Sequence, residues 1–360
     1  MKVVIVQPAI PSYRLGLFSR LADRLGPQLL VYASPGKLGV LTEHAPCAWE
    51  RTLGPIRAVL PGLEWQPGAL SIPLDRGDVL VVSGAPRCLS NIALLLKARW
   101  KGARTIWWGH YWSSTSRPWR AGLRMVLMRL ADAILFYTDR EAEEYLATRK
   151  NNRKPVAALN NGIETGEIVT LRKPYDPVLR PRDLLFIGRL TRKAELALLL
   201  EALALPVCAG VTLDVIGEGG EEEALRRQAS VLGLSGRIAW HGGTTDERQI
   251  AEIANRCKAF VYPGSVGLSL IHAFAYGLPA VVHDDRWKHM PEIAALRAGT
   301  NGLTFAEGSA ASLADTIRAL LGDHPALKRM STEGIAMTDR TFNTKDMAER
   351  FYKTIMEQCC

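Results

Sequence analysis

Short apolar stretches alternate with amphipathic stretches along most of the chain, in two successive series. Such alternation predicts parallel strands covered by helices on both faces of a sheet. The predicted strands are residues 3–6, 29–32, 79–82, 105–108, 133–136 and 156–159 in the first series, and 184–187, 213–216, 238–240, 259–262 and 280–282 in the second. Two such series predict an α/β chain with two Rossmann-like, doubly wound domains that face an interdomain cleft.

The intervening amphipathic stretches predict the helices. They are residues 14–25, 88–100, 119–130 and 140–148, then 195–204, 220–232, 247–255, 268–276, 310–321 and 325–338, and a last helix from about 344. Residues 34–75 are rich in Pro and Gly and carry no firm prediction.

A polar stretch with Pro174, Pro177 and Pro181 separates the two series and is typical of an interdomain linker. We therefore expect domains at residues 1–165 and 166–342, with the helix over 343–360 packing back on the first domain. In open parallel sheets, ligands bind outside the carboxyl ends of the strands, so the loops that follow the strands are the places to look for function.

The net charge of +9 is concentrated in one sector. Residues 79–131 contain no Asp or Glu, nine Lys or Arg and five of the nine tryptophans, so the rest of the chain is formally neutral. A basic, Trp-rich sector fits an anionic membrane surface or a phosphate-bearing partner. Within it, the segment RPWRAGLRMVLMR at 117–129 predicts an amphipathic helix with Arg117, Arg120 and Arg124 on its basic face. The alternative is a helix packed on the sheet with a solvated basic face.

Several function classes lack their sequence signatures. The six cysteines show no paired spacing, which argues against a disulfide framework and a zinc site and favours a reducing cytoplasm. The chain contains no GxxxxGK[ST], HExxH or DxD motif, and a GxGxxG fingerprint fails at Glu222. It has no apolar stretch of about 18 residues. Nucleic-acid binding rests on charge alone and is the least favoured class. We expect a cytoplasmic protein that is peripheral at the membrane.

Two strand-to-helix stretches carry the chemistry. In Phe186–Leu190 (FIGRL), Gly188 ends a predicted strand and Arg189 follows at the edge of the sheet, ahead of a helix whose N-terminal amides suit a diphosphate. The alternative is an ordinary strand, turn and helix with a solvated Arg. In the second stretch, the loop at 264–267 (GSVG) can bring bare amides close to a ligand, at the start of a helix near Leu268.

Together with WGH at 108–110, NNGI at 160–163, VIGEG at 215–219, GLP at 277–279 and PE at 291–292, these stretches resemble the retaining, nucleotide-sugar-dependent glycosyltransferases of family 4. The resemblance covers essentially the whole chain. It implies the two-domain GT-B fold, with the donor in the second domain and the acceptor in the first.

The resemblance assigns roles by position. Arg189 matches the diphosphate-binding arginine, while the position of the family's partner lysine falls on Ala194, so either Lys193 replaces it or the lysine is absent. The Glu-x7-Glu pair falls on Gly264 and His272. His272 is either a ribose ligand or a helix histidine with a structural partner.

Further residues are expected at the two sites. The donor-binding set is Gly188, Glu218, Gly219, Ser265, Val266, Gly267, Leu268, Ser269 and His272. In the first domain, His110 lies where the family has a histidine near the reacting sugar, although a structural role remains open. Tyr13, Arg14 and Trp112 are expected on the acceptor side of the cleft. No metal or cofactor is implied.

The function implied is transfer of a hexose-type sugar, with retention, from a GDP- or UDP-sugar to a saccharide acceptor. With the basic sector, the acceptor is expected to be lipid-linked, as in surface polysaccharide or glycolipid biosynthesis, and residues 79–131 are expected to meet an anionic membrane surface. The alternative is a non-catalytic relative that binds a nucleotide sugar or a partner subunit, because Ala194, Gly264 and His272 stand at positions where the family has polar or acidic residues.

Overall fold

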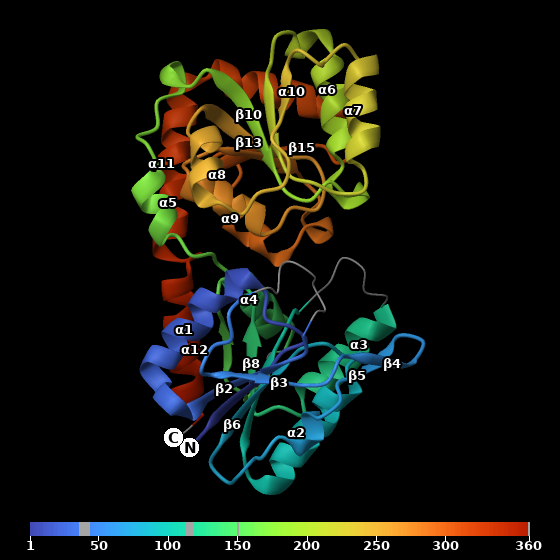
Figure 1. Cartoon of the computed structure of the whole chain (residues 1–360), viewed down its shortest axis with the longest axis vertical. Coiled ribbons are helices and arrows are strands. Elements are labelled where there is room, and N and C mark those ends of the chain that lie inside the picture. The colour runs from blue at the N-terminus through green and yellow to red at the C-terminus, as the bar shows by residue number, and fades with distance from the viewer. Residues whose placement is uncertain (36–43, 112–117, 150, 359–360) are drawn as a thin grey trace. The chain divides into compact units, whose positions relative to one another are not determined.

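The computed structural model describes residues 1–35, 44–111, 118–149 and 151–358, with the side chains of 118–121 and 123 left out (Figure 1). The chain forms two compact units. Unit 1 contains Met1–Asn161 and Thr344–Cys360, and unit 2 contains Gly162–Asn343.

Unit 1 is built on a parallel sheet with the strand order β3-β2-β1-β6-β7-β8-β9. The order reverses between β1 and β6, because the chain adds strands on one side of β1 and then on the other. The bounds of the strands are β1 Val3–Val6, β2 Leu29–Ala33, β3 Glu50–Thr52, β6 Val79–Ser83, β7 Arg104–Trp108, β8 Ala133–Phe136 and β9 Val156–Ala158. A separate antiparallel hairpin joins β4 Arg57–Leu60 and β5 Leu63–Trp65.

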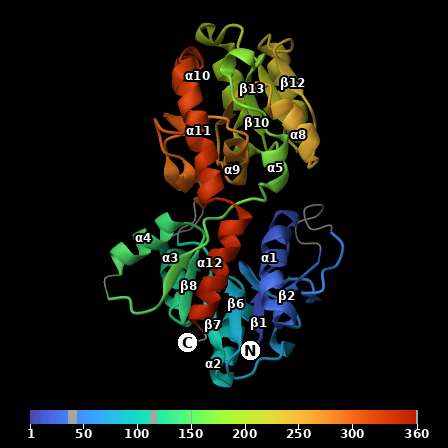
Figure 2. The ribbon, with the colours of Figure 1, turned by 90° about the vertical axis from the view of Figure 1, so that its left-hand side faces the viewer.

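Alternate side chains of the unit 1 strands point to opposite faces of the sheet, and both faces are buried. In β1, Val3 and Ile5 belong to one apolar core, and Val4 and Val6 belong to the other. Helices α1 (Leu15–Leu25) and α12 (Thr344–Glu357) cover the first core, while α2 (Leu89–Lys101), α3 (Pro118–Met128) and α4 (Asp139–Thr148) cover the second. Helix α12, the last helix of the chain, therefore packs beside α1, as Figure 2 also shows.

Unit 2 repeats this architecture with the strand order β12-β11-β10-β13-β14-β15, again all parallel. Here the order reverses between β10 and β13. Its strands are β10 Arg182–Ile187, β11 Leu213–Ile216, β12 Ile238–Trp240, β13 Cys257–Tyr262, β14 Ala280–His283 and β15 Gly302–Phe305. Its helices are α5 Gly166–Leu171, α6 Leu196–Ala204, α7 Glu222–Val231, α8 Glu247–Ala254, α9 Leu268–Ala275, α10 Ala310–Gly322 and α11 His324–Arg340.

The predicted α/β class with two doubly wound, Rossmann-like units is confirmed. Every stretch predicted as a strand overlaps an observed strand. The structure adds β3, β4 and β5 from the region without a firm prediction, and it adds β15.

The predicted linker is wrong as a description of residues 164–181, which are packed on unit 2. The segment contains helix α5 and is fixed by buried side chains. The guanidinium of Arg180 donates hydrogen bonds to the carbonyl oxygens of Ala254 and Cys257, and the Tyr175 hydroxyl donates to the carbonyl oxygen of Lys258. Proline and polar residues are typical of linkers, but here they surround two anchoring side chains.

The basic, Trp-rich sector is partly core. Trp107 and Trp108 lie on a central strand and are buried on opposite faces of the sheet. Arg124 is not on a solvated face: it is buried, and its Nη1 donates a hydrogen bond to the carbonyl oxygen of Tyr111. Burial lowers the pKa of Arg124, although the nearby Glu141 carboxylate opposes this shift. Arg117 and Trp112 lie outside the described residues.

Candidate functional site

The loops that follow β10 and β11 in unit 2 pack backbone against backbone. The N–H of Leu190 donates to the carbonyl oxygen of Glu218 at 2.9 Å, and the N–H of Gly188 donates to that of Ile216. A Cβ on Gly217 would lie 1.9 Å from the carbonyl oxygen of Gly188, and one on Gly219 would lie 2.3 Å from that of Leu190. Only glycine permits this approach, which holds Gly188, Arg189 and Glu218 at the carboxyl edge of the sheet.

The loop after β13 contacts the turn that precedes α6 in the same way. Gly264 and Ser265 donate backbone hydrogen bonds to the carbonyl oxygens of Ala194 (3.1 Å) and Lys193 (2.9 Å). A Cβ on Gly264 would lie 2.1 Å from the carbonyl oxygen of Lys193. The position that the resemblance matches to a glutamate thus has no room for any side chain in this structure.

The loops place Arg189 and Lys193 in solvent at this edge, whereas Ala194 is fully buried. Gly188 lies against the Tyr262 ring and near the Ser269 hydroxyl, since a Cβ on it would be 2.9 Å from the ring and 3.6 Å from the Ser269 Oγ. The pKa of Tyr262 is raised by burial, and the positive charge of Arg189 acts against that rise. The structure therefore brings Gly188, Arg189 and Ser269 together around Tyr262, a residue that the sequence analysis missed.

Helix α9 begins beside these residues, at Leu268. Its N-cap is Gly267, which offers no side chain, so no side-chain cap occupies the first amides of the helix. Exposed amides and the positive end of a helix dipole favour an anion. Arg189 and the start of α9 are thus two anion-binding elements at the same edge of the sheet, where the strand order reverses.

His272 has a partner on α8. Its Nε2 donates to Glu247 Oε1 at 2.9 Å, and the Tyr276 hydroxyl donates to the same oxygen at 2.5 Å. Burial alone would raise the pKa of Glu247, but the hydrogen bonds from His272 and Tyr276 outweigh burial and lower it. The contacts made by His272 are those of a structural helix histidine, and its role toward a ribose stays a prediction. Glu247 gave no motif signal in the sequence.

A buried histidine, His289, supports the 264–267 loop. The N–H of Val266 donates to His289 Nδ1 at 3.2 Å, and His289 Nε2 donates to the carbonyl oxygen of His283 at 3.0 Å. The two imidazoles stack with their centroids 3.7 Å apart. Burial lowers the pKa of His289 to about 4, so the ring is neutral and Nδ1 is free to accept. This contact joins loops that are distant in sequence and could not be read from a motif.

The candidate residues of unit 1 form an aromatic cluster. The ring of His110 stacks on Tyr137 with centroids 4.2 Å apart, and its Nδ1 lies 3.7 Å from the buried carboxylate of Glu141. Arg14, which was expected to line a cleft, is buried; its guanidinium carbon lies 5.1 Å from the centroid of the Trp108 ring. Tyr13 is partly exposed. Cation–π packing accounts for the burial of Arg14.

The comparisons with known proteins agree with this geometry. The family model of "Glycosyl transferases group 1" matches residues 169–337, which lie within unit 2. Unit 2 contains a group 1 glycosyltransferase domain.

Two proteins of known name are similar to this chain over most of its length. The chain is 27% identical over 268 residues to the lipopolysaccharide core biosynthesis glycosyltransferase LpsE of Rhizobium meliloti, covering 72% of this chain and 70% of that protein. It is also 27% identical over 288 residues to an exopolysaccharide phosphotransferase of Streptomyces coelicolor, but this match spans only 28% of that protein.

Solved structures confirm the predicted GT-B fold. Anabaena HepE in complex with UDP superposes with a TM-score of 0.73 at 17% identity, covering 99% of this chain and 100% of that one. Sucrose-phosphate synthase from Thermosynechococcus elongatus gives a TM-score of 0.69 at 16% identity, covering 99% and 98%.

The packing of Gly264 predicts that a glutamate, the residue that the resemblance matches to this position, is not tolerated there. We expect Gly264→Glu to lower the free energy of unfolding by at least about 2 kcal/mol, because its Cβ would displace the backbone at Lys193. Chemical denaturation measures the loss. Gly236→Ala is the matched control, since a Cβ there meets nothing within 4 Å. A variant as stable as the control would contradict the packing.

The His289 contact predicts a pH dependence. The unfolded chain protonates His289 below about pH 6.5, whereas the folded chain resists protonation down to about pH 4. The stabilisation is thus fully present above pH 6.5 and is lost as the pH falls toward 4, by up to roughly 3 kcal/mol. His289→Asn keeps an acceptor for the Val266 N–H and cannot titrate, so denaturation between pH 7.5 and 4.5 should show a flatter stability profile for it. If stability falls equally with pH in the wild-type protein and in His289→Asn, His289 does not cause the pH dependence.

Proposed function

We propose that the chain is a retaining glycosyltransferase that moves a hexose-type sugar from a UDP- or GDP-sugar to a saccharide acceptor. The observation that carries the proposal is the group 1 domain whose loops after β10, β11 and β13 meet at the switch point of the sheet. Arg189, Lys193 and the start of α9 are the anion-binding groups at that edge. The chemistry that suits such an edge is the binding of a diphosphate.

In the proposed reaction, Arg189 binds the diphosphate and stabilises the charge that develops as the anomeric C–O bond breaks. The acceptor hydroxyl attacks the anomeric carbon on the face that the leaving phosphate occupies, and a phosphate oxygen takes the hydroxyl proton. One glycosidic bond forms, one sugar–phosphate bond breaks, and the configuration is retained. No protein nucleophile, metal or cofactor takes part. The amides of Gly267 and Leu268, at the start of α9, replace the contact that a glutamate makes in family 4.

The relatives support the choice of substrates. Structures of HepE contain UDP, UDP and glucose, or UDP-glucose, which supports a UDP-sugar as the donor. LpsE is named for lipopolysaccharide core biosynthesis, which supports an acceptor that belongs to a cell-surface glycan. A lipid-linked saccharide is the form of acceptor that also fits a protein working at a membrane surface.

One observation favours a second function. Ala194 is buried, Gly264 has no space for a side chain, and His272 is paired with Glu247, so three polar positions of the family lack their usual groups. A protein that binds a nucleotide sugar without turning it over would tolerate these changes. Transfer or hydrolysis of the donor by the wild-type protein, lost in Arg189→Ala, distinguishes the enzyme from the binding protein.

Nucleotide binding is the first test of the donor site. We expect UDP or GDP to raise the melting temperature, and Arg189→Ala to weaken the binding at least about tenfold, because a charge-assisted contact to phosphate is lost. Arg192→Ala is the matched control, since Arg192 is largely exposed and its Nε lies 3.5 Å from Glu221. Equal nucleotide binding by Arg189→Ala and Arg192→Ala would show that Arg189 does not bind the diphosphate.

We further propose that unit 1 attaches to anionic lipid at the cytoplasmic face of the membrane through α2. Leu96 and Trp100 lie one turn apart on α2 and are 53% and 81% exposed. Arg99 and Lys101 flank Trp100, and the Lys101 ammonium lies 4.8 Å from the centroid of the Trp100 ring. An exposed indole beside cations suits a membrane interface. Among the described residues, no helix is long and apolar enough to cross a membrane.

Vesicle flotation tests this attachment. The wild-type protein should float with vesicles that contain phosphatidylserine, and Leu96→Ser with Trp100→Ser should reduce the bound fraction several-fold, because the apolar contact is lost. Val231→Ser is the matched control, as Val231 is an exposed apolar residue of unit 2. Flotation that ignores anionic lipid, or that survives the double substitution, would count against α2.

A further inference from the structure

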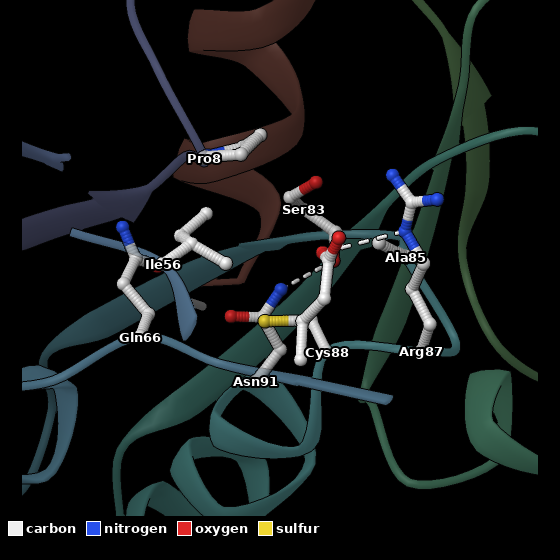
Figure 3. A pocket seen from close by; sticks show the side chains of 9 residues that line it. Pro8, Ile56, Gln66, Ser83, Ala85, Arg87, Cys88 and Asn91 are labelled. Atoms are coloured by element: carbon white, nitrogen blue, oxygen red, sulfur yellow. Dashed lines mark hydrogen bonds and ion pairs between the residues drawn. The ribbon is translucent and has the colours of Figure 1, made fainter. Parts of the chain in front are cut away.

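Unit 1 contains a small pocket that no part of the donor chemistry uses (Figure 3). The enclosed space is about 40 Å³, and it reaches about 300 Å³ only when the open solvent at its mouth is included. Its lining comes from the loops after β1 and β6, from the β4–β5 hairpin and from the start of α2: Pro8, Ile56, Glu64, Gln66, Ser83, Ala85, Arg87, Cys88 and Asn91. β1 and β6 are the strands between which the order of the sheet reverses. Ligands of open α/β sheets bind at such a point.

The floor of the pocket holds a buried acceptor without a partner. Asn91 is only 2% exposed, and its Nδ2 donates a hydrogen bond to the carbonyl oxygen of Ser83 at 2.8 Å. This bond fixes the orientation of the amide, because a flipped side chain would place two oxygens against each other. Among the described residues, Asn91 Oδ1 has no hydrogen-bond partner. A buried acceptor of this kind can take a hydrogen bond from a donor outside the protein, either a water molecule or a ligand hydroxyl.

Gln66, which also lines the pocket, is held in place by hydrogen bonds. Gln66 is buried, and its Nε2 donates to the carbonyl oxygen of Gln7 (3.0 Å) and to the Ser34 hydroxyl (2.9 Å). Its backbone N–H donates to the Ser90 hydroxyl at 3.1 Å. These bonds tie the β4–β5 hairpin to the loop after β1 and to α2, so the floor of the pocket is preorganised. Preorganised polar groups lower the cost of binding a small ligand.

The lining combines a neutral ion pair with apolar surfaces. At the rim, the Nε of Arg87 lies 3.3 Å from a carboxylate oxygen of Glu64, so the pocket carries one charge of each sign. Pro8, Ile56 and Ala85 contribute apolar surface. The described lining residues carry no net charge, which does not suit a phosphate, and include no aromatic ring on which a base could stack. A sugar ring has both the hydroxyl groups and the C–H faces that this lining matches.

We propose that this pocket binds one edge of a sugar ring, with a ring hydroxyl donating to Asn91 Oδ1. Glu64 and Arg87 then supply an acceptor and a donor for neighbouring hydroxyls, and Ile56 and Pro8 contact the C–H face. Assigning that sugar to the acceptor rests on the proposed function. The proposal that the pocket binds a sugar does not depend on the proposed function.

The test measures sugar binding and nucleotide binding separately on the full chain. Saturation-transfer NMR with D-glucose, D-galactose, D-mannose and N-acetyl-D-glucosamine reports the pocket, and the melting-temperature shift with UDP and GDP reports the donor site. Ala85→Leu fills the pocket while leaving Asn91 and its bond to Ser83 in place. Ala58→Leu, on an exposed position of β4, is the matched control.

We expect at least one of the four sugars to give saturation transfer with the wild-type protein and with Ala58→Leu. The signal should fall at least fivefold in Ala85→Leu, with the UDP or GDP shift unchanged. Asn91→Leu should lose the signal as well, and Ala85→Leu keeps the test decisive if that variant does not fold. No signal with the wild-type protein, or a signal that survives Ala85→Leu, overturns the proposal. Sugar binding without any nucleotide shift would support the pocket and contradict the proposed function.

Discussion

The candidate donor site depends on how closely three loops of unit 2 approach one another. Gly217 and Gly219 allow the loop after β11 to pack against Gly188 and Leu190, and Gly264 allows the loop after β13 to hydrogen-bond to the turn at Lys193 and Ala194. These are contacts between main-chain atoms, so the side chains of Arg189, Lys193 and Ser269 need not be used to hold the loops together. The backbone is fixed by hydrogen bonds, and the cations and helix amides stay available for a ligand.

The departures from the family pattern are physically connected. Gly264 donates its N–H to the carbonyl oxygen of Ala194, so the two positions that the resemblance matches to a glutamate and a lysine are neighbours in one backbone contact. A bulky residue at 264 would separate the loop from the turn. His272, at the second glutamate position, is held by the Glu247 carboxylate from α8. The carboxylate next to this position therefore comes from α8 and not from the loop that precedes α9.

The fold could be predicted because strands buried on both faces leave an unambiguous apolar pattern. β1 and β8 are apolar along their whole length, β6 is apolar except for Ser83 at its end, and each was located to within a residue. The hairpin β4–β5 was missed because β4 is exposed along its length and has no core face to reveal it. Residues 164–181 were interpreted as a linker because no local pattern shows that Arg180 reaches carbonyl groups more than 70 positions away. Arg124 was placed in solvent for the same reason.

Part of the candidate site could be predicted from the sequence, namely the glycines and cations next to the strand ends. The roles of Glu247, Tyr262, His289 and Asn91 could not be predicted, because they depend on tertiary contacts.

The two units share one topological rule but differ in the chemistry of their loops. Each sheet reverses its strand order once, between β1 and β6 in unit 1 and between β10 and β13 in unit 2, and the loops that follow those strands border the candidate site of each unit. In unit 2 the site is bordered by the start of α9, which has no side-chain cap, and by exposed cations, which suit an anion. In unit 1 it is lined by an amide with a free acceptor, a neutral ion pair and apolar surface, which suit a polyol. The chemistry of the loops, rather than the shared fold, therefore separates a candidate diphosphate site from a candidate sugar site.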